Sequence, residues 1–363
     1  MTQQTPLYQC HVDMGAKIVD FAGWSMPIQY TSQIEEHHQV RSDAGMFDVS
    51  HMTVVDLHGE RVRDFLSYVM ANDIAKVTKR GKALYTAMLN EQGGVIDDLI
   101  IYYLEDHFFR LVVNAATRDK DLAWLEQQAA AFSVEVKERS DLAMIAVQGP
   151  KAIEKALQLI PEEFRESVLA LSKFEACEVA ELFVARTGYT GEDGLEIILP
   201  NESAPDFWKA LDKVGVAPIG LGARDSLRLE AGMNLYGNDM DESTTPLVSA
   251  LGWTVAMKDE RDFIGRAALE QQKQAGVPQK LVGLVLEGRG VMRAHQKVFV
   301  DGDEVGELTS GGFSPTLKNS IGLARIARDS ASLGDTVEIE IRNKRIAARI
   351  VKYPFVRDGQ AQI

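Results

Sequence analysis

Hydrophobic residues in the first part of the chain repeat with helical spacing in one segment and form short apolar runs in several others. Val62, Phe65, Leu66 and Val69 fall at positions i, i+3, i+4 and i+7, which predicts a helix over residues 61–70 with one buried face. The other elements complete an antiparallel sheet with helices on one face. They are strands at 52–57, 84–90, 95–103 and 108–113, and a helix at 117–131 with Asp119 and Asp121 in its first turn.

A similar order of elements recurs farther along, whereas the first 50 residues follow no regular period. Pro150 suits the start of a helix, because its ring fixes φ and its missing N–H would be unpaired there anyway. Two α+β units of similar order suggest an internal duplication, although no residue-level repeat is visible. The expected elements of the second unit are strands at 142–147, 178–187 and 194–199 and helices at 149–160 and 204–214.

The pattern changes again near residue 281, where short apolar runs alternate with turns. Val337, Ile339 and Ile341 alternate with charged residues, the period of two that is typical of a half-buried strand. We expect a small all-β barrel here. The polar segment 271–279 is the expected linker to it.

Composition and charge mainly exclude classes of protein. The chain has 363 residues, 45% hydrophobic and 25% charged, and a net charge of −14, which disfavours nucleic-acid binding. No run of 18 apolar residues and no signal peptide is visible, so no membrane association is expected. The only cysteines, Cys10 and Cys177, are expected to be reduced, which favours a cytoplasmic location.

Two adjacent carboxylates stand inside the apolar run 95–103. Neighbouring residues of a strand point to opposite faces, so one of Asp97 and Asp98 should face inward and the other solvent. An inward carboxylate needs donors or a ligand, because a buried unpaired charge is costly. The alternative is a solvated pair beside a turn.

Glu196 is a second carboxylate in an apolar strand, just after a loop with glycines at 188, 191 and 194. Such a loop is typical of a tight turn that needs positive φ. Glu196 then either faces a ligand or belongs to the edge of a hairpin.

Arg224 and Asp225 stand at the start of a helical pattern. An arginine there opposes the helix macrodipole, which favours an anionic ligand or a salt bridge to a neighbouring acid. The segment imitates a dinucleotide-binding glycine motif, but Asp225 occupies the place of the third glycine, so we reject that reading.

The histidines predict no metal site. Residues 35–38 read Glu-Glu-His-His, but no HExxH or His-x-His spacing occurs. His51 is either a ligand contact or a hydrogen-bonded core histidine. Nucleophile-elbow and Walker motifs are absent.

Several of these clusters belong to one ordered set of motifs. Over residues 5–357 the chain resembles the glycine cleavage T-protein family. The segments that carry the resemblance are 5–8, 21–27, 47–52, 93–99, 187–194, 223–239, 309–315 and 352–357.

The resemblance implies a three-domain α+β cloverleaf with tetrahydrofolate in a central channel. Residues 1–50 and 141–270 would form the first α+β domain, 51–140 the second, and 278–363 the C-terminal β-barrel. It also implies an aminomethyltransferase that acts on the aminomethyl group carried by the dihydrolipoyl arm of H-protein. Ammonia is released and 5,10-methylenetetrahydrofolate is formed. No metal is required, because the task is chiefly to position the two reactants.

By motif, the resemblance implies that Asp98 is the catalytic carboxylate and that Glu196 and Arg224 bind folate. Weaker folate contacts implied by it are Tyr85, Asn114, Tyr189 and Tyr236, with Arg357 near the glutamate tail.

Three alternatives remain. A folate-dependent tRNA-maintenance relative would carry a cysteine motif where residues 235–238 stand, and the folate domain of sarcosine oxidases would follow a flavin domain. A non-catalytic folate-binding protein would keep Glu196 and Arg224 but would not need Asp98.

Overall fold

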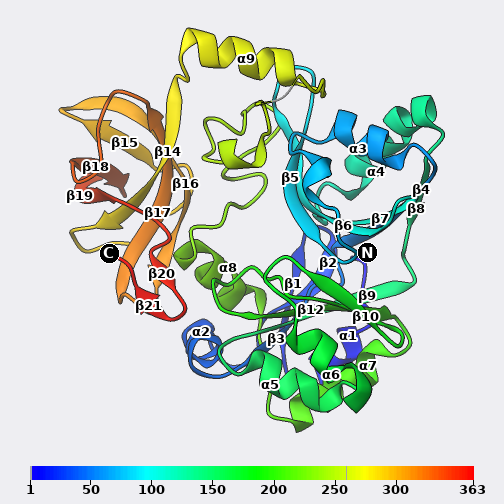
Figure 1. Cartoon of the computed structure of the whole chain (residues 1–363). Coiled ribbons are helices and arrows are strands. Elements are labelled where there is room, and N and C mark those ends of the chain that lie inside the picture. The colour runs from blue at the N-terminus through cyan, green and yellow to red at the C-terminus, as the bar shows by residue number, and fades with distance from the viewer. Residues whose placement is uncertain (1, 259) are drawn as a thin grey trace.

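Three lobes meet around a common centre in the computed structural model, which describes residues 2–258 and 260–363 (Figure 1). Two lobes are α+β sheets, one of six strands and one of five, and the third is a closed six-stranded barrel. The expected α+β class and C-terminal barrel are confirmed. Within the described residues, no helix is both long and apolar enough to cross a membrane.

The first lobe is a six-stranded sheet whose strands come from both sides of the second lobe in the sequence. One face packs on α5–α7 around the fully buried Ile145, Ile197 and Trp208. In spatial order its strands are Ala176–Val179 (β10), Leu182–Ala185 (β11), Gly194–Pro200 (β12), Leu142–Gln148 (β9), Gly45–Asp48 (β3) and Ala217–Pro218 (β13). A hairpin, Lys17–Phe21 (β1) and Trp24–Gln29 (β2), and the helices Tyr8–Asp13 (α1), Gln33–Ser42 (α2), Ala152–Ala156 (α5), Glu162–Leu169 (α6), Ala204–Lys213 (α7) and Leu221–Glu230 (α8) surround it.

The second lobe is an antiparallel five-stranded sheet with helices on one face, as expected from the sequence. That face buries Phe65, Leu111 and Leu125, which come from both helices and the sheet. The other face turns toward the centre, where the Tyr102 ring packs edge-on against Phe183 of the first lobe at 5.0 Å. Its elements are Ala83–Leu89 (β5), Val95–Glu105 (β6), Phe108–Val113 (β7), Thr53–His58 (β4), Glu135–Glu138 (β8), Val62–Val69 (α3) and Arg118–Ala129 (α4).

The barrel closes through the order β14-β17-β16-β15-β18-β19 around a core that includes Leu284, Leu308 and Ile339. A helix, Arg266–Ala275 (α9), runs along the top of the view from the second lobe toward the barrel and leads into it (Figure 1). The strands are Gln279–Leu286 (β14), Lys297–Val300 (β15), Asp303–Ser314 (β16), Asn319–Ala327 (β17), Thr336–Ile341 (β18) and Lys344–Val351 (β19), followed by the pair Val356–Arg357 (β20) and Gln360–Ala361 (β21).

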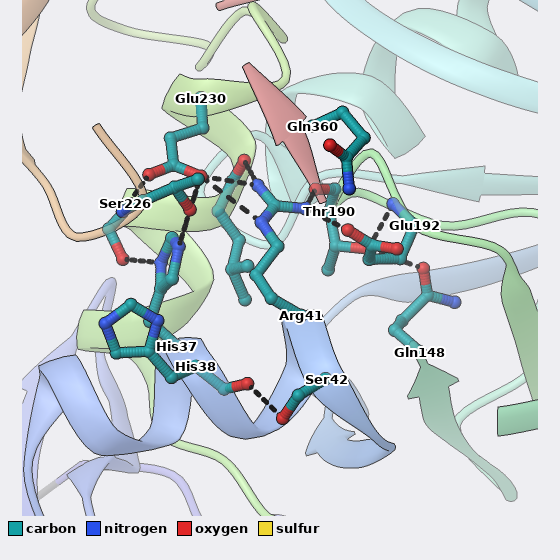
Figure 2. Close-up of polar contacts among 12 residues, drawn as sticks. His37, His38, Arg41, Ser42, Gln148, Thr190, Glu192, Ser226, Glu230 and Gln360 are labelled. Carbon is teal, nitrogen blue, oxygen red and sulfur yellow. Dashed lines mark hydrogen bonds and ion pairs between the residues drawn. The ribbon is translucent and has the colours of Figure 1, made fainter. Parts of the chain in front are cut away.

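A buried ion-pair cluster joins the first lobe to the barrel at the end of α8. The Glu230 carboxylate is fully buried and accepts hydrogen bonds from Arg41 Nη2 at 2.8 Å and Thr316 Oγ1 at 2.9 Å, and His37 Nε2 lies 3.1 Å away. Figure 2 shows Arg41 between Glu230 and Glu192. Since α8 also carries Arg224, this cluster holds in place the helix that positions Arg224.

Two expectations about elements were wrong. Residues 178–187 form parts of two strands, β10 and β11, because Ala180 turns the chain with a φ of 51°. The polar segment 271–279 is mostly helix, since α9 continues to Ala275 and ends at Gly276. It resembled a linker because α9 buries only Leu269. Residues 2–50, part of the stretch that showed no period, hold two helices and three strands.

Candidate active site

A pocket of about 270 Å³ lies where the three lobes meet. The second lobe supplies side chains of β5 and β6, the first lobe supplies β12 and α8, and Tyr353 approaches from the segment after the barrel. Seven of the eight candidate residues line this pocket: Tyr85, Asp98, Asn114, Tyr189, Glu196, Arg224 and Tyr236.

Asp97 and Asp98 point to opposite faces of β6, as the alternation predicted, but neither faces open solvent. Asp97 is fully buried on the side of the helices, and Asp98 lines the pocket. Asp98 lies opposite Ala87 of β5, so Tyr85 is its diagonal neighbour on the same face. The Asp98 carboxylate accepts hydrogen bonds from Tyr85 Oη at 2.7 Å and Asn114 Nδ2 at 3.0 Å.

Burial, and then the charge of Asp97, raise the pKa of Asp98 to about 7, while the hydrogen bonds from Tyr85 and Asn114 oppose the shift. Burial and the Asp98 charge raise the pKa of Tyr85 well above its ordinary value, so its hydroxyl stays a donor at neutral pH. Asp98 can therefore gain or lose a proton near neutral pH, and its ionised form can stabilise a positive charge that develops beside it.

Glu196 points from β12 into the same pocket with much of its hydrogen-bonding capacity free. Among the described residues, Thr187 Oγ1 is the one side-chain donor to its carboxylate, at 2.5 Å. Burial raises the pKa of Glu196, and Thr187 and the Arg224 charge partly offset this. A ligand that brings N–H donors to Glu196 would complete its hydrogen bonding.

The glycines before Glu196 serve close packing more than backbone freedom. Only Gly191 of the three has positive φ, at 80°. A Cβ at Gly188 would come within 1.9 Å of Gln148 Oε1, and one at Gly194 within 2.2 Å of Val147 O. The absence of a side chain at Gly188 and at Gly194 therefore allows the Tyr189 loop to lie directly against β9.

Arg224 is the fourth residue of α8, which begins after Gly220. Its guanidinium lies 4.5 Å from the centre of the Tyr189 ring, and no hydrogen bond or ion pair joins it to a described side chain. The expected alternative, a salt bridge to a neighbouring acid, is not formed, because Asp225 pairs with Arg228 at 2.8 Å. Burial lowers the pKa of Arg224. The pocket thus holds a cation with donors available to a ligand.

Tyrosines and one tryptophan complete the wall. Tyr189 donates to the Asn234 carbonyl, and Tyr236 donates to the Val95 carbonyl at 3.1 Å. Trp253 is 65% exposed and stacks on Tyr85, with ring centres 5.4 Å apart. Trp253 was not selected from the sequence, because an isolated Gly-Trp pair carries no local signal of a pocket.

Arg357 does not line this pocket. It lies in an adjoining hollow of about 400 Å³ that also contains Lys173. The hollow and the pocket share Phe174, Gly188 and Met233 in their walls, so the two spaces adjoin.

His51 lies in the wall of a separate polar cavity of about 510 Å³. It is buried, its Nδ1 has no hydrogen-bond partner among the described residues, and its ring packs edge-on against Phe21 at 5.6 Å. The alternative of a hydrogen-bonded core histidine therefore receives no support at Nδ1 among the described residues. Burial, with the Arg224 charge, lowers the pKa of His51 to about 4.

The Glu-Glu-His-His segment has a structural role. The Glu36 carboxylate accepts from the backbone N–H of Tyr30 at 2.6 Å and of Gly220 at 2.7 Å, and His37 contacts Glu230. In the described part of the chain, no three His, Cys, Asp or Glu side chains group as metal ligands.

Comparison with known proteins identifies the family. Residues 7–259 match the GCVT N-terminal domain, and residues 279–357 match the glycine cleavage T-protein C-terminal barrel domain. The chain belongs to the glycine cleavage T-protein family. The aminomethyltransferases of Xanthomonas campestris pv. campestris (strain 8004) and Xanthomonas axonopodis pv. citri (strain 306) are each 58% identical over 367 residues, which is 100% of this chain and 98% of each relative. The crystal structure of glycine cleavage system aminomethyltransferase T from Bartonella henselae has 36% identity and a TM-score of 0.92, with 99% of both chains covered.

The expected family, fold class and enzymatic activity are confirmed. This T-protein family member is an aminomethyltransferase of the glycine cleavage system, and that activity is favoured over the tRNA-maintenance and non-catalytic alternatives. The family uses tetrahydrofolate as a substrate. The roles of the individual pocket residues stay predictions.

Proposed function

We propose that the central pocket binds tetrahydrofolate with its pterin against Glu196 and its reacting nitrogen beside Asp98. What supports this is the placement of Asp98, Glu196 and Arg224, which come from two lobes, in one pocket. The amino and ring N–H groups of a pterin would donate to the Glu196 carboxylate. Arg224 offers the complementary donors to ligand oxygen or nitrogen acceptors.

The adjoining hollow supports a further part of this proposal. A folate continues from its pterin through an aromatic ring to an anionic glutamate tail. A tail that extends past Phe174 and Met233 would enter the hollow in which Arg357 and Lys173 lie. Both are exposed cations, so they would attract a carboxylate there without the desolvation cost of a buried pair.

The second substrate is the aminomethyl group carried as a thioether on the dihydrolipoyl arm of H-protein. Its carbon exchanges bonds to nitrogen and sulfur for bonds to the two folate nitrogens. The amine leaves as ammonia and the sulfur as a free thiol, and these two groups take up the two folate N–H protons. The Asp98 carboxylate would orient the folate nitrogen and stabilise its developing positive charge.

Turnover with purified aminomethylated H-protein and tetrahydrofolate, followed by ammonia release, tests this proposal. We expect ammonia and 5,10-methylenetetrahydrofolate in equal amounts, and neither product when H-protein or folate is omitted. Folate binding without turnover would instead identify a non-catalytic folate-binding protein. A cytoplasmic location is part of the proposal, and the free thiols of Cys10 and Cys177 are consistent with it.

A further inference from the structure

Two buried carboxyls lie on the face of β6 opposite the pocket. Asp97 on β6 and Asp121 on α4 are both fully buried where the helix packs on the sheet. Their carboxyls lie within hydrogen-bonding contact of each other. Two ionised carboxylates this close would repel each other in a site that water does not reach. The pair therefore needs a positive charge or a shared proton.

The hydrogen bonds around the pair are unequal. Asp97 accepts from the backbone N–H of Asn114 at 3.0 Å and from its side-chain Nδ2 at 2.9 Å. Neither oxygen of Asp121 accepts from an N–H or hydroxyl donor of the described residues. The Thr117 hydroxyl lies beside both carboxyls and lowers the pKa of each, and the hydrogen bond that it donates goes to the Asn114 carbonyl at 3.0 Å. What Asp121 can do in this position is donate, and it can do so only in its protonated form.

No cation of the described residues forms an ion pair with either carboxyl, although the charge of Lys120 partly offsets the raised pKa of Asp121. Lys120 is next to Asp121 on α4, but its ammonium bonds to the Tyr236 hydroxyl at 2.7 Å and to Glu242. The other titratable groups that act on the pair from packed elements are an acid and phenols. They are Asp98 on β6, Tyr85 on β5 and Tyr236 after α8.

The protonation state follows from these surroundings. Burial raises the pKa of Asp97, and burial together with the Asp97 charge raises the pKa of Asp121 to about 10. Because Asp97 already accepts two hydrogen bonds from Asn114 and neither oxygen of Asp121 accepts from an N–H donor of the described residues, the geometry favours the shared proton on Asp121, with Asp97 as its acceptor.

Asn114 connects this pair to the pocket. Its Nδ2 group, held by Asp97 Oδ1 at 2.9 Å, also donates to Asp98 Oδ1 at 3.0 Å. Its backbone N–H, held by Asp97 Oδ2, fixes the main chain directly after β7. The orientation of the amide that meets Asp98 thus depends on Asp97 remaining an acceptor at both oxygens.

We propose that Asp121 is a positioning residue for Asp98: it stays protonated, donates to Asp97, and so keeps Asp97 as the acceptor that aims Asn114 at Asp98. This inference rests on the proposed role of Asp98 in turnover. In this proposal Asp121 on α4 acts on Asp98 only through Asp97 and Asn114, since Asp121 does not itself line the pocket.

The test compares two substitutions that differ in one donor. In Asp121→Asn the amide N–H replaces the carboxyl O–H, so we expect kcat within roughly threefold of the native enzyme and an unchanged pH profile. In Asp121→Leu the donor is lost while the volume is nearly kept. Asp97, left buried without that donor, should take up a proton itself, and Asn114 then loses an acceptor. We expect kcat to fall roughly tenfold or more and its acid limb to move to lower pH, because the Asp97 charge no longer raises the pKa of Asp98.

Folate affinity should stay the same in both variants, because Glu196 and Arg224 keep their surroundings. Asp119, whose side chain is 90% exposed on the same helix, gives the matched control, and Asp119→Asn and Asp119→Leu should both behave as the native enzyme. The proposal is overturned if Asp121→Asn loses as much kcat as Asp121→Leu, or if Asp121→Leu keeps the native pH profile.

Infrared spectroscopy gives a readout independent of turnover. The native protein at neutral pH should show the carbonyl band of a protonated carboxyl that Asp121→Asn removes. Absence of that difference would refute the shared proton whether or not the enzyme turns over. Absence of turnover by the native protein, with the band present, would refute only the proposed function.

Discussion

Asp98 lies in the pocket with two donors on its carboxylate and a pKa near 7. If its ionised form stabilises the charge on the folate nitrogen, activity should fall as pH drops through about 7. Activity is lost on the acid side because a raised pKa leaves Asp98 protonated and neutral up to a higher pH. A kcat profile between pH 5.5 and 8.5 measures this, with an acid limb near 7 that Asp98→Asn abolishes.

We further expect Asp98→Asn to bind folate and to lose most of its turnover, roughly 100-fold or more. Asp97→Asn should lose less, because Asp97 acts on Asp98 only through Asn114 and does not itself line the pocket. The Asp98 variant should also unfold at the same or a higher temperature at pH 8. Because the pKa of Asp98 is raised by folding, the ionised carboxylate destabilises the folded state at pH values above the pKa that Asp98 has in the unfolded chain. The uncharged amide of the variant removes that destabilisation. Equal losses in the two variants would point to the wrong carboxylate.

Glu196 offers a test of how the pterin is held. Glu196 is half-buried in the pocket and, among the described residues, its carboxylate accepts from one side-chain donor, Thr187. If a pterin supplies further donors, Glu196→Ala leaves them unpaired in a buried site, a cost of about 1–3 kcal/mol, or roughly 5- to 150-fold in Kd. Calorimetric titration with folate measures this. Thr187→Val, which removes only the supporting hydroxyl, should weaken binding less. Unchanged affinity in Glu196→Ala would return Glu196 to a structural role in β12.

At the scale of elements, α8 is held by the Glu230 cluster at its C-terminal end. Burial alone would raise the pKa of Glu230, but hydrogen bonds from His37 and Ser314 and the charge of Arg41 lower it to about 2. Its stabilising effect is therefore fully present above about pH 4.5 and is lost as pH falls toward 2. We expect Glu230→Gln to cost about 3–5 kcal/mol at pH 7, because Arg41 loses a buried counter-charge.

Denaturant titrations at pH 7 and pH 3.5 measure this effect, and the difference between native and variant should shrink at the lower pH. Glu126→Gln on the exposed side of α4 is the matched control and should leave stability within about 0.5 kcal/mol. A stability difference that does not depend on pH would show that packing, and not the charge of Glu230, holds α8 in place.

Elements with a strong period were predictable from the sequence, and those defined by exposure or contact were not. The helix α3 was found from its apolar spacing, and β18 from its alternation. The helix α9 was mistaken for a linker because its residues are polar on most sides. The break between β10 and β11 was missed because Ala180 is not a residue type that signals positive φ. The domain boundaries expected from the sequence stay a prediction.

The site residues were predictable from the family resemblance and not from local sequence patterns. Spacing alone left Asp98, Glu196 and Arg224 each with a structural alternative, and only the family resemblance united them. Asp121 looked like a helix-start carboxylate that favours the macrodipole, because sequence spacing does not reveal that α4 presses it against β6. Trp253 was missed because its stacking on Tyr85 brings together residues far apart in the chain.

At the scale of the whole molecule, the pocket exists only where the lobes meet. Tyr85 and Asp98 come from one sheet, Glu196 from another, and Tyr353 follows the barrel. Movements of one lobe against another would change the distance between groups that must meet the same ligand. The Glu230 cluster and the Tyr102–Phe183 contact oppose such movement on two sides of the centre.

The net charge of −14 affects how H-protein can dock on this enzyme. The swinging arm must leave after each turnover, so a small, transient interface suits this partner better than a large one. If H-protein is acidic as well, its docking on this acidic enzyme requires a local basic patch. Exposed charge pairs are screened within a Debye length of about 8–10 Å at moderate salt. We therefore expect KM for H-protein to rise with salt.

Folate affinity should change less over the same salt range, because Glu196 and Arg224 lie half-buried in the pocket, where salt screens more weakly than at the open surface. Steady-state kinetics between low and moderate potassium chloride, with folate titrations at each concentration, separate the two effects. A series in which sucrose replaces the salt controls for viscosity and water activity. If KM for H-protein stays flat or falls as salt is added, electrostatic steering is refuted. An apolar contact with Trp253, which lines the pocket and is 65% exposed, then becomes the better account of docking.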